Sequence, residues 1–92
     1  MPEVQIISAP WCKRCQTVKP DVTEHCRIGG AELTILDYDE MEDEDKASVK
    51  SLPTIRIRLT PDAGWMIFTA DTLEQFKQTL VKAALSSTTT DF

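Results

Sequence analysis

The sequence lacks long apolar runs, and no stretch approaches the roughly 20 residues that a membrane-spanning helix needs. We also expect no signal peptide at its start, because MPEVQII carries no positively charged segment. We therefore expect a cytoplasmic protein, and structural disulfides rarely persist in that compartment. The chain has three cysteines, and an odd number fits poorly with a secreted scaffold that disulfides hold together.

Positive charge is also scarce, with 10 Lys and Arg against 15 Asp and Glu and a formal net charge of −5. Nucleic acids and anionic membranes attract basic surfaces, so we expect neither as a partner. A length of 92 residues, of which 41% are hydrophobic, suits one domain with a modest core. We expect a monomeric domain over residues 1–86 and a disordered tail over residues 87–92, which have nothing to bury.

Hydrophobic patterns predict four strands and two long helices. We expect strands at residues 4–8, 33–38, 53–59 and 65–69, and helices at residues 12–26 and from residue 72 onward. Residues 39–51 are rich in charge and poor in apolar side chains, so they predict a thin surface helix or a single helical turn.

The order of these elements predicts how the strands pair. The first two strands are joined through a helix and should be parallel, whereas the last two should form an antiparallel hairpin. Ile55 and Ile57 alternate with Arg56 and Arg58, which suggests that one face of the hairpin is only partly covered. The economical packing is an α/β fold, a four-stranded mixed sheet flanked by helices.

Two cysteines, Cys12 and Cys15, stand one helical turn apart at the start of the first predicted helix. Unpaired backbone N–H groups and the helix dipole favour an anion there, so they stabilise a thiolate at Cys12. Lys13 and Arg14 add positive charge with the same effect, and they also favour an acidic partner surface. Because the thiolate is the nucleophile of thiol–disulfide exchange, this pair is typical of a redox centre.

A zinc site is the first alternative, since Cys12, Cys15, His25 and Cys26 are suitable ligand types. Cys26 lies 11 residues beyond Cys15, which is about 16 Å along an unbroken helix. One ion cannot reach both ends of such a helix, so we expect no metal. Cys26 shares the apolar stripe of the helix and should be a buried, inert thiol.

These residues resemble the thioredoxin/glutaredoxin family. Trp11 directly precedes the first cysteine, Pro20 follows Cys15 by five residues, and Leu-Pro-Thr occupies residues 52–54. A C-x-x-C motif alone is weak, but together with the strand–helix context and the two placed prolines it is specific. The resemblance extends over about residues 3–85 and implies a thioredoxin-like fold.

The resemblance also implies an activity, that of a protein disulfide oxidoreductase. Cys12 would be the attacking thiol and Cys15 the resolving thiol, and no cofactor is needed beyond their redox-active disulfide. Pro53 would follow a cis peptide bond and face the cysteines, the backbone of Leu52 would pair with a bound substrate strand, and Trp11 would flank the site.

The partners implied are disulfide-containing client proteins, with a ribonucleotide reductase as one candidate. Thioredoxin reductase or reduced glutathione would restore the dithiol. Two other functions stay open, a glutathione-coupled glutaredoxin and a non-catalytic partner module. The chain is of glutaredoxin size, yet it has Phe-Thr-Ala-Asp at residues 68–71 where glutaredoxins often have the Gly-Gly turn that binds glutathione. Asp71 and Thr72 would have to replace part of that site.

One departure from thioredoxins concerns proton transfer. Ile6 occupies the position of a buried aspartate in that family, and Ile35 the position of its neighbouring lysine. The absence of both the aspartate and the lysine is physically consistent, because burying one charge without its partner costs free energy. The proton acceptor for Cys15 is therefore open among water, Asp37 and Asp39.

Overall fold

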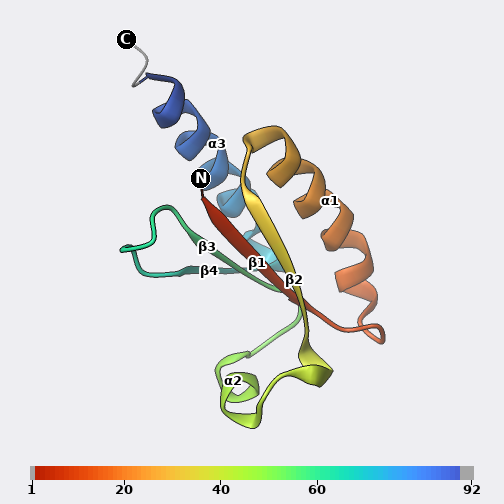
Figure 1. The fold of residues 1–92 in the computed structure, drawn as a ribbon. Helices are drawn as coiled ribbons and strands as arrows, with labels where there is room; N and C mark the ends of the chain where they lie inside the picture. The colour runs from red at the N-terminus through yellow and green to blue at the C-terminus, as the bar shows by residue number, and fades with distance from the viewer. Residues whose placement is uncertain (1, 90–92) are drawn as a thin grey trace.

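The chain folds into a four-stranded sheet, and helices connect or follow its strands along the sequence (Figure 1). The computed structural model describes residues 2–89. The longer elements are β1 (Glu3–Ser8), α1 (Lys13–Gly29), β2 (Glu32–Asp37), α2 (Asp43–Ser48), β3 (Thr54–Arg58), β4 (Met66–Thr69) and α3 (Leu73–Thr89). Two short 3-10 helices, η1 (Tyr38–Glu40) and η2 (Ala70–Thr72), follow β2 and β4. This order is the predicted one.

The sheet has the strand order β2-β1-β3-β4 and is mixed, as predicted. β1 pairs in parallel with β2, and Ile6 lies opposite Ile35 in that pair. β3 pairs antiparallel with both β1 and β4. The predicted hairpin is therefore confirmed, although its strands are shorter, because β3 ends before Leu59 and β4 begins after Trp65.

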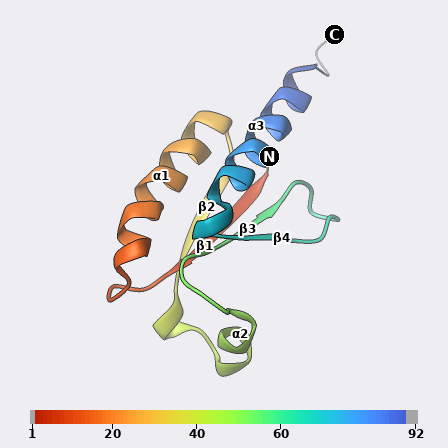
Figure 2. The same ribbon diagram turned by 180° about the vertical axis from the view of Figure 1, so that it is seen from behind.

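Helices α1 and α3 both pack on one face of the sheet (Figure 2). The core between them consists of Val4, Ile6, Val18, Val22, Cys26, Ile55, Ile57, Phe76 and Leu80. The glycine pair ends α1 as predicted: Gly30 takes the left-handed conformation, at φ 71°, and its N–H bonds to the Cys26 carbonyl. α3 continues to Thr89, beyond the domain end predicted at residue 86, and residues 90–92 of the predicted tail lie outside the described residues.

Among residues 2–89, no long helix covers the opposite face of the sheet. α2 is only six residues long, buries none of them and lies beyond the end of the sheet at which α1 begins (Figures 1 and 2). Arg56 and Arg58 project on this open face, where Trp65 packs against them with its ring centre 5.5 and 4.6 Å from the two guanidinium carbons. The prediction of a partly covered hairpin face is therefore confirmed.

Candidate active site

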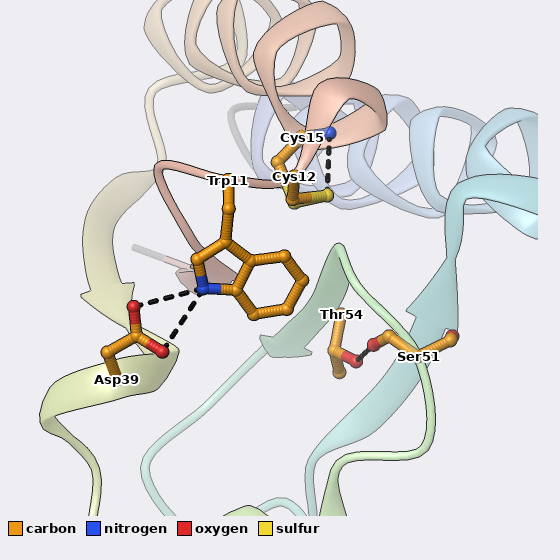
Figure 3. The surroundings of a disulfide bond; sticks show 6 residues. All are labelled: Trp11, Cys12, Cys15, Asp39, Ser51 and Thr54. Carbon is orange, nitrogen blue, oxygen red and sulfur yellow. Dashed lines mark hydrogen bonds between the residues drawn. A yellow bond between two sulfur atoms is a disulfide. The ribbon is translucent and has the colours of Figure 1, made fainter.

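A disulfide joins Cys12 and Cys15 at the N-terminus of α1, with 5.3 Å between their Cα atoms (Figure 3). Cys12 is the residue that caps the helix, and its Sγ accepts a hydrogen bond of 3.1 Å from the Cys15 backbone N–H. Cys12 retains 8% of its surface exposed, whereas Cys15 retains none. A partner sulfur can therefore approach Cys12 but not Cys15.

The two cysteines lie in apolar surroundings, apart from the main core. Together with Ala9 they form a small buried cluster, and Tyr38 and Leu52 pack against it. The Leu52–Pro53 peptide bond is cis, as the resemblance implied. The chain segment before Pro53 is thus brought against the disulfide, although 37 residues separate Leu52 from Cys15 in the sequence.

Trp11 is exposed beside the disulfide, at 63% of its surface, yet it is held in place. Its Nε1–H donates to both carboxylate oxygens of Asp39, at 3.2 and 3.0 Å (Figure 3). Its ring meets Tyr38 edge-on, with 6.4 Å between the ring centres. Asp39 is itself positioned by a backbone hydrogen bond of 3.0 Å to the Asp37 carboxylate. These contacts fix an aromatic surface next to the more accessible sulfur.

A groove of about 290 Å³ runs between this aromatic wall and the loop before Pro53. It is lined by Trp11, Cys12, Tyr38, Val49, Lys50, Ser51 and Leu52. The loop is tied down where the Thr54 hydroxyl donates to the Ser51 carbonyl at 2.6 Å (Figure 3). Cys12, the more exposed of the two cysteines, therefore lies on the wall of this groove.

Of the residues that the sequence placed at the site, Trp11, Cys12 and Leu52 line the groove, Cys15 is joined to Cys12, and Pro53 is fully buried. Lys13 and Arg14 are exposed on the first turn of α1 and do not line the groove. Sequence reasoning missed Tyr38 and Lys50 as groove residues. Their positions in the sequence could have indicated this. Tyr38 directly follows β2, at the end of the sheet where β1 leads to the cysteines, and Lys50 stands three residues before Pro53.

The proton acceptor for Cys15 is not a buried carboxylate among the side chains that the structure describes. The buried polar ones are Ser8 and Thr54, and Ile6 is fully buried at the position in question. Ile35, its partner across the strands, is half exposed at the sheet edge. Asp37 and Asp39 lie on the site's rim and are already hydrogen-bonded.

The third cysteine is remote from the groove. α1 is unbroken from Lys13 to Gly29, so about 16 Å of helix axis separates Cys15 from Cys26, as the argument against zinc requires. His25 is engaged elsewhere, with its Nδ1 3.1 Å from an Asp21 carboxylate oxygen. Cys26 is 2% exposed, and burial raises the pKa of its thiol to about 11. It is therefore the buried thiol that the sequence predicted.

Several solved thioredoxin structures are similar to this chain in fold. That of Fasciola hepatica has a TM-score of 0.71 and 24% identity over 89% of this chain and 80% of its own. The germline-specific thioredoxin Deadhead of Drosophila melanogaster has a TM-score of 0.74 and 20% identity over 88% of this chain and 79% of its own. Thioredoxin O1 of Arabidopsis thaliana, in its oxidised state, has a TM-score of 0.71 and 17% identity over 89% and 77%.

Searches by sequence give no comparable match, since neither a protein-family model nor a curated protein matches the chain. Two findings identify the fold: the similarity to solved thioredoxin structures, and the Cys12–Cys15 pair at the start of α1. Both agree, and the chain has the thioredoxin-like fold. Within the described residues, no helix is long and apolar enough to cross a membrane.

Proposed function

We propose that this protein is a thiol–disulfide oxidoreductase of thioredoxin type that reduces or exchanges protein disulfides through Cys12 and Cys15. The observation that carries the proposal is the position of the disulfide. It lies at a helix N-terminus, where Cys12 lines a groove of about 290 Å³ together with the loop before the cis-proline. A structural disulfide has no need of an open groove, whereas a redox disulfide must meet its partner.

In the first step the reduced protein attacks a substrate disulfide. The Cys12 thiolate is stabilised by the helix N-terminus and by the Cys15 N–H, which already donates to its sulfur at 3.1 Å. It displaces one substrate sulfur as a thiolate, which takes up a proton, and a mixed disulfide forms between Cys12 and the other substrate sulfur.

In the second step Cys15 resolves the mixed disulfide. Its sulfur, as thiolate, attacks Cys12 Sγ, and the second substrate sulfur leaves as a thiolate and is protonated. The substrate gains two electrons and two protons, and the protein is left with the Cys12–Cys15 disulfide. Because Cys15 is buried, an external disulfide reacts with Cys12 first, which fixes the order of the two steps. Water, Asp37 or Asp39 would accept the Cys15 proton.

A reductant that supplies two electrons must then restore the dithiol, and we assign this to the dithiol of a thioredoxin reductase or to two molecules of reduced glutathione. The clients would be disulfide-containing proteins such as a ribonucleotide reductase. A dedicated glutathione site is less well supported, because the Thr72 hydroxyl accepts the Thr69 N–H at 2.8 Å and Asp71 adds negative charge at that turn. The free, buried Cys26 suits a reducing compartment, so a cytoplasmic location belongs to the same proposal.

The test is reduction of a fluorogenic peptide disulfide by the prereduced protein. Wild type should release two thiols per molecule of protein oxidised, and Cys12→Ser should be inactive. Cys26→Ser is the matched control and should retain the wild-type rate. If Cys12→Ser and Cys15→Ser proteins keep full biological activity, the chain is a non-catalytic partner module instead.

A further inference from the structure

Charge is unevenly distributed around the groove. Of the seven residues that line it, Lys50 alone carries a positive charge at neutral pH. Lys50 is exposed, on the loop side of the groove, across from the wall made by Trp11 and Tyr38. A peptide that lies in the groove against Cys12 therefore meets a cation within its own length.

The carboxylate of Asp39, which contacts the groove wall, is already hydrogen-bonded to Trp11. Both carboxylate oxygens of Asp39 accept the Trp11 indole N–H, and Asp39 does not line the groove. Lys46 lies over the Tyr38 ring, 5.5 Å from its centre, and adds a further cation in contact with the same wall. Lys13 and Arg14 are exposed on the turn that carries the cysteines.

The acidic side chains of α2 oppose this local excess of positive charge. Asp43, Glu44 and Asp45 are exposed and do not line the groove. At physiological ionic strength, charges more than about 8 Å apart across solvent are largely screened. A substrate side chain inside the groove would contact Lys50 directly. For such a side chain, this short-range interaction outweighs the screened attraction or repulsion from the protein's overall negative charge.

We propose that the groove selects disulfides flanked by an acidic side chain, and that Lys50 is the specificity-determining residue. The inference rests on the proposed disulfide exchange at Cys12. Successive residues of an extended strand rise about 3.3 Å. Since Lys50 and Cys12 line one groove, the acidic residue lies one or two positions from the substrate cysteine. The ion pair that forms is exposed, so its effect on selectivity is modest.

The experiment compares three peptide disulfides that differ only in the residue next to cysteine, which is Glu, Gln or Lys. Stopped-flow rate constants are measured with the reduced protein at 0.15 M ionic strength. The Glu peptide should react about threefold faster than the Lys peptide, as expected for one exposed ion pair. Lys50→Gln should bring the ratio close to one, and Lys50→Glu should reverse it. Any effect on Cys12 reactivity is common to the three peptides and cancels in the ratio.

The matched control is Lys82→Glu, which makes the same charge change at an exposed position on α3 outside the groove. It should leave the ratio unchanged. A wild-type ratio of one or below overturns the inference, and so does a Lys82→Glu effect as large as that of Lys50→Glu, since selectivity would then follow net charge. If none of the three peptides is reduced, the proposed oxidoreductase function fails instead.

Discussion

Replacing Asp39 with alanine removes the acceptor that fixes Trp11 beside the disulfide. The indole N–H loses both oxygens, which lie 3.2 and 3.0 Å away. Water can replace them, because Trp11 is 63% exposed. The edge-on contact with Tyr38 stays, so Trp11 keeps its neighbour but loses its orientation.

The expected loss of stability is small for the same reason. A hydrogen bond to a charged acceptor contributes about 1.5–3 kcal/mol when shielded, but exposed charged pairs measure about 0.2–1 kcal/mol. We therefore expect Asp39→Ala to lower the free energy of unfolding by about 0.5 kcal/mol. In a domain of this size that corresponds to a fall in melting temperature of about 2–4 °C.

The assay combines denaturant unfolding with tryptophan anisotropy decay in a Trp65→Phe background, where Trp11 is the sole emitter. Trp11 should gain fast motion in Asp39→Ala, and the peptide-disulfide rate should fall about two- to fivefold as the groove wall loosens. Glu40→Ala, a loss of charge in the same short helix, is the control and should change neither signal. Unaltered Trp11 motion in Asp39→Ala, or a stability loss above about 2 kcal/mol, would show that Asp39 does not hold Trp11 through an exposed hydrogen bond.

Three further predictions concern the cysteines and the end of α1. Cys15→Ser should accumulate a mixed disulfide with a peptide substrate, seen by intact mass, whereas an adduct on Cys12→Ser would contradict the assigned order of attack. Burial raises the pKa of Cys26 to about 11 from a usual value of 9.0, so the folded protein holds that proton more tightly than the unfolded chain. The stability that this protonated thiol contributes is full below pH 9 and is lost as the pH rises to about 11. In chemical denaturation, wild type should therefore lose about 2 kcal/mol more of its free energy of unfolding than Cys26→Ala over that range. An equal dependence of stability on pH in the two proteins would show that Cys26 is not buried. Gly30→Ala should cost about 1–2 kcal/mol, because Gly30 adopts φ 71°, and an unchanged melting temperature would show that this cap is not formed.

Much of the fold was predictable from local patterns. The alternation of Ile55 and Ile57 with Arg56 and Arg58 predicted the third strand and its half-covered face, and the glycine pair predicted the end of α1. Such signals are local, since they depend on the period of burial along one element. Strand ends were less certain, and Leu59 fell outside β3 because nothing on the neighbouring strand pairs with it.

The site was predictable only in part. The cysteine pair and the cis peptide bond before Pro53 follow from motif and context. The bond between Trp11 and Asp39 joins residues 28 apart, and no local pattern encodes such a contact. Lys50 became a groove residue for a similar reason, since its position depends on how the loop before Pro53 folds back on the disulfide.

The proposed function requires that Cys12 and Cys15 form a reversible redox couple. It is tested most directly by equilibrating the native protein in buffers of defined potential, alkylating free thiols and counting them by mass. We expect a two-electron transition confined to Cys12 and Cys15, at roughly −180 to −280 mV, with Cys26 alkylated only after unfolding. Absence of any such transition, or a transition in which Cys26 takes part, would contradict it.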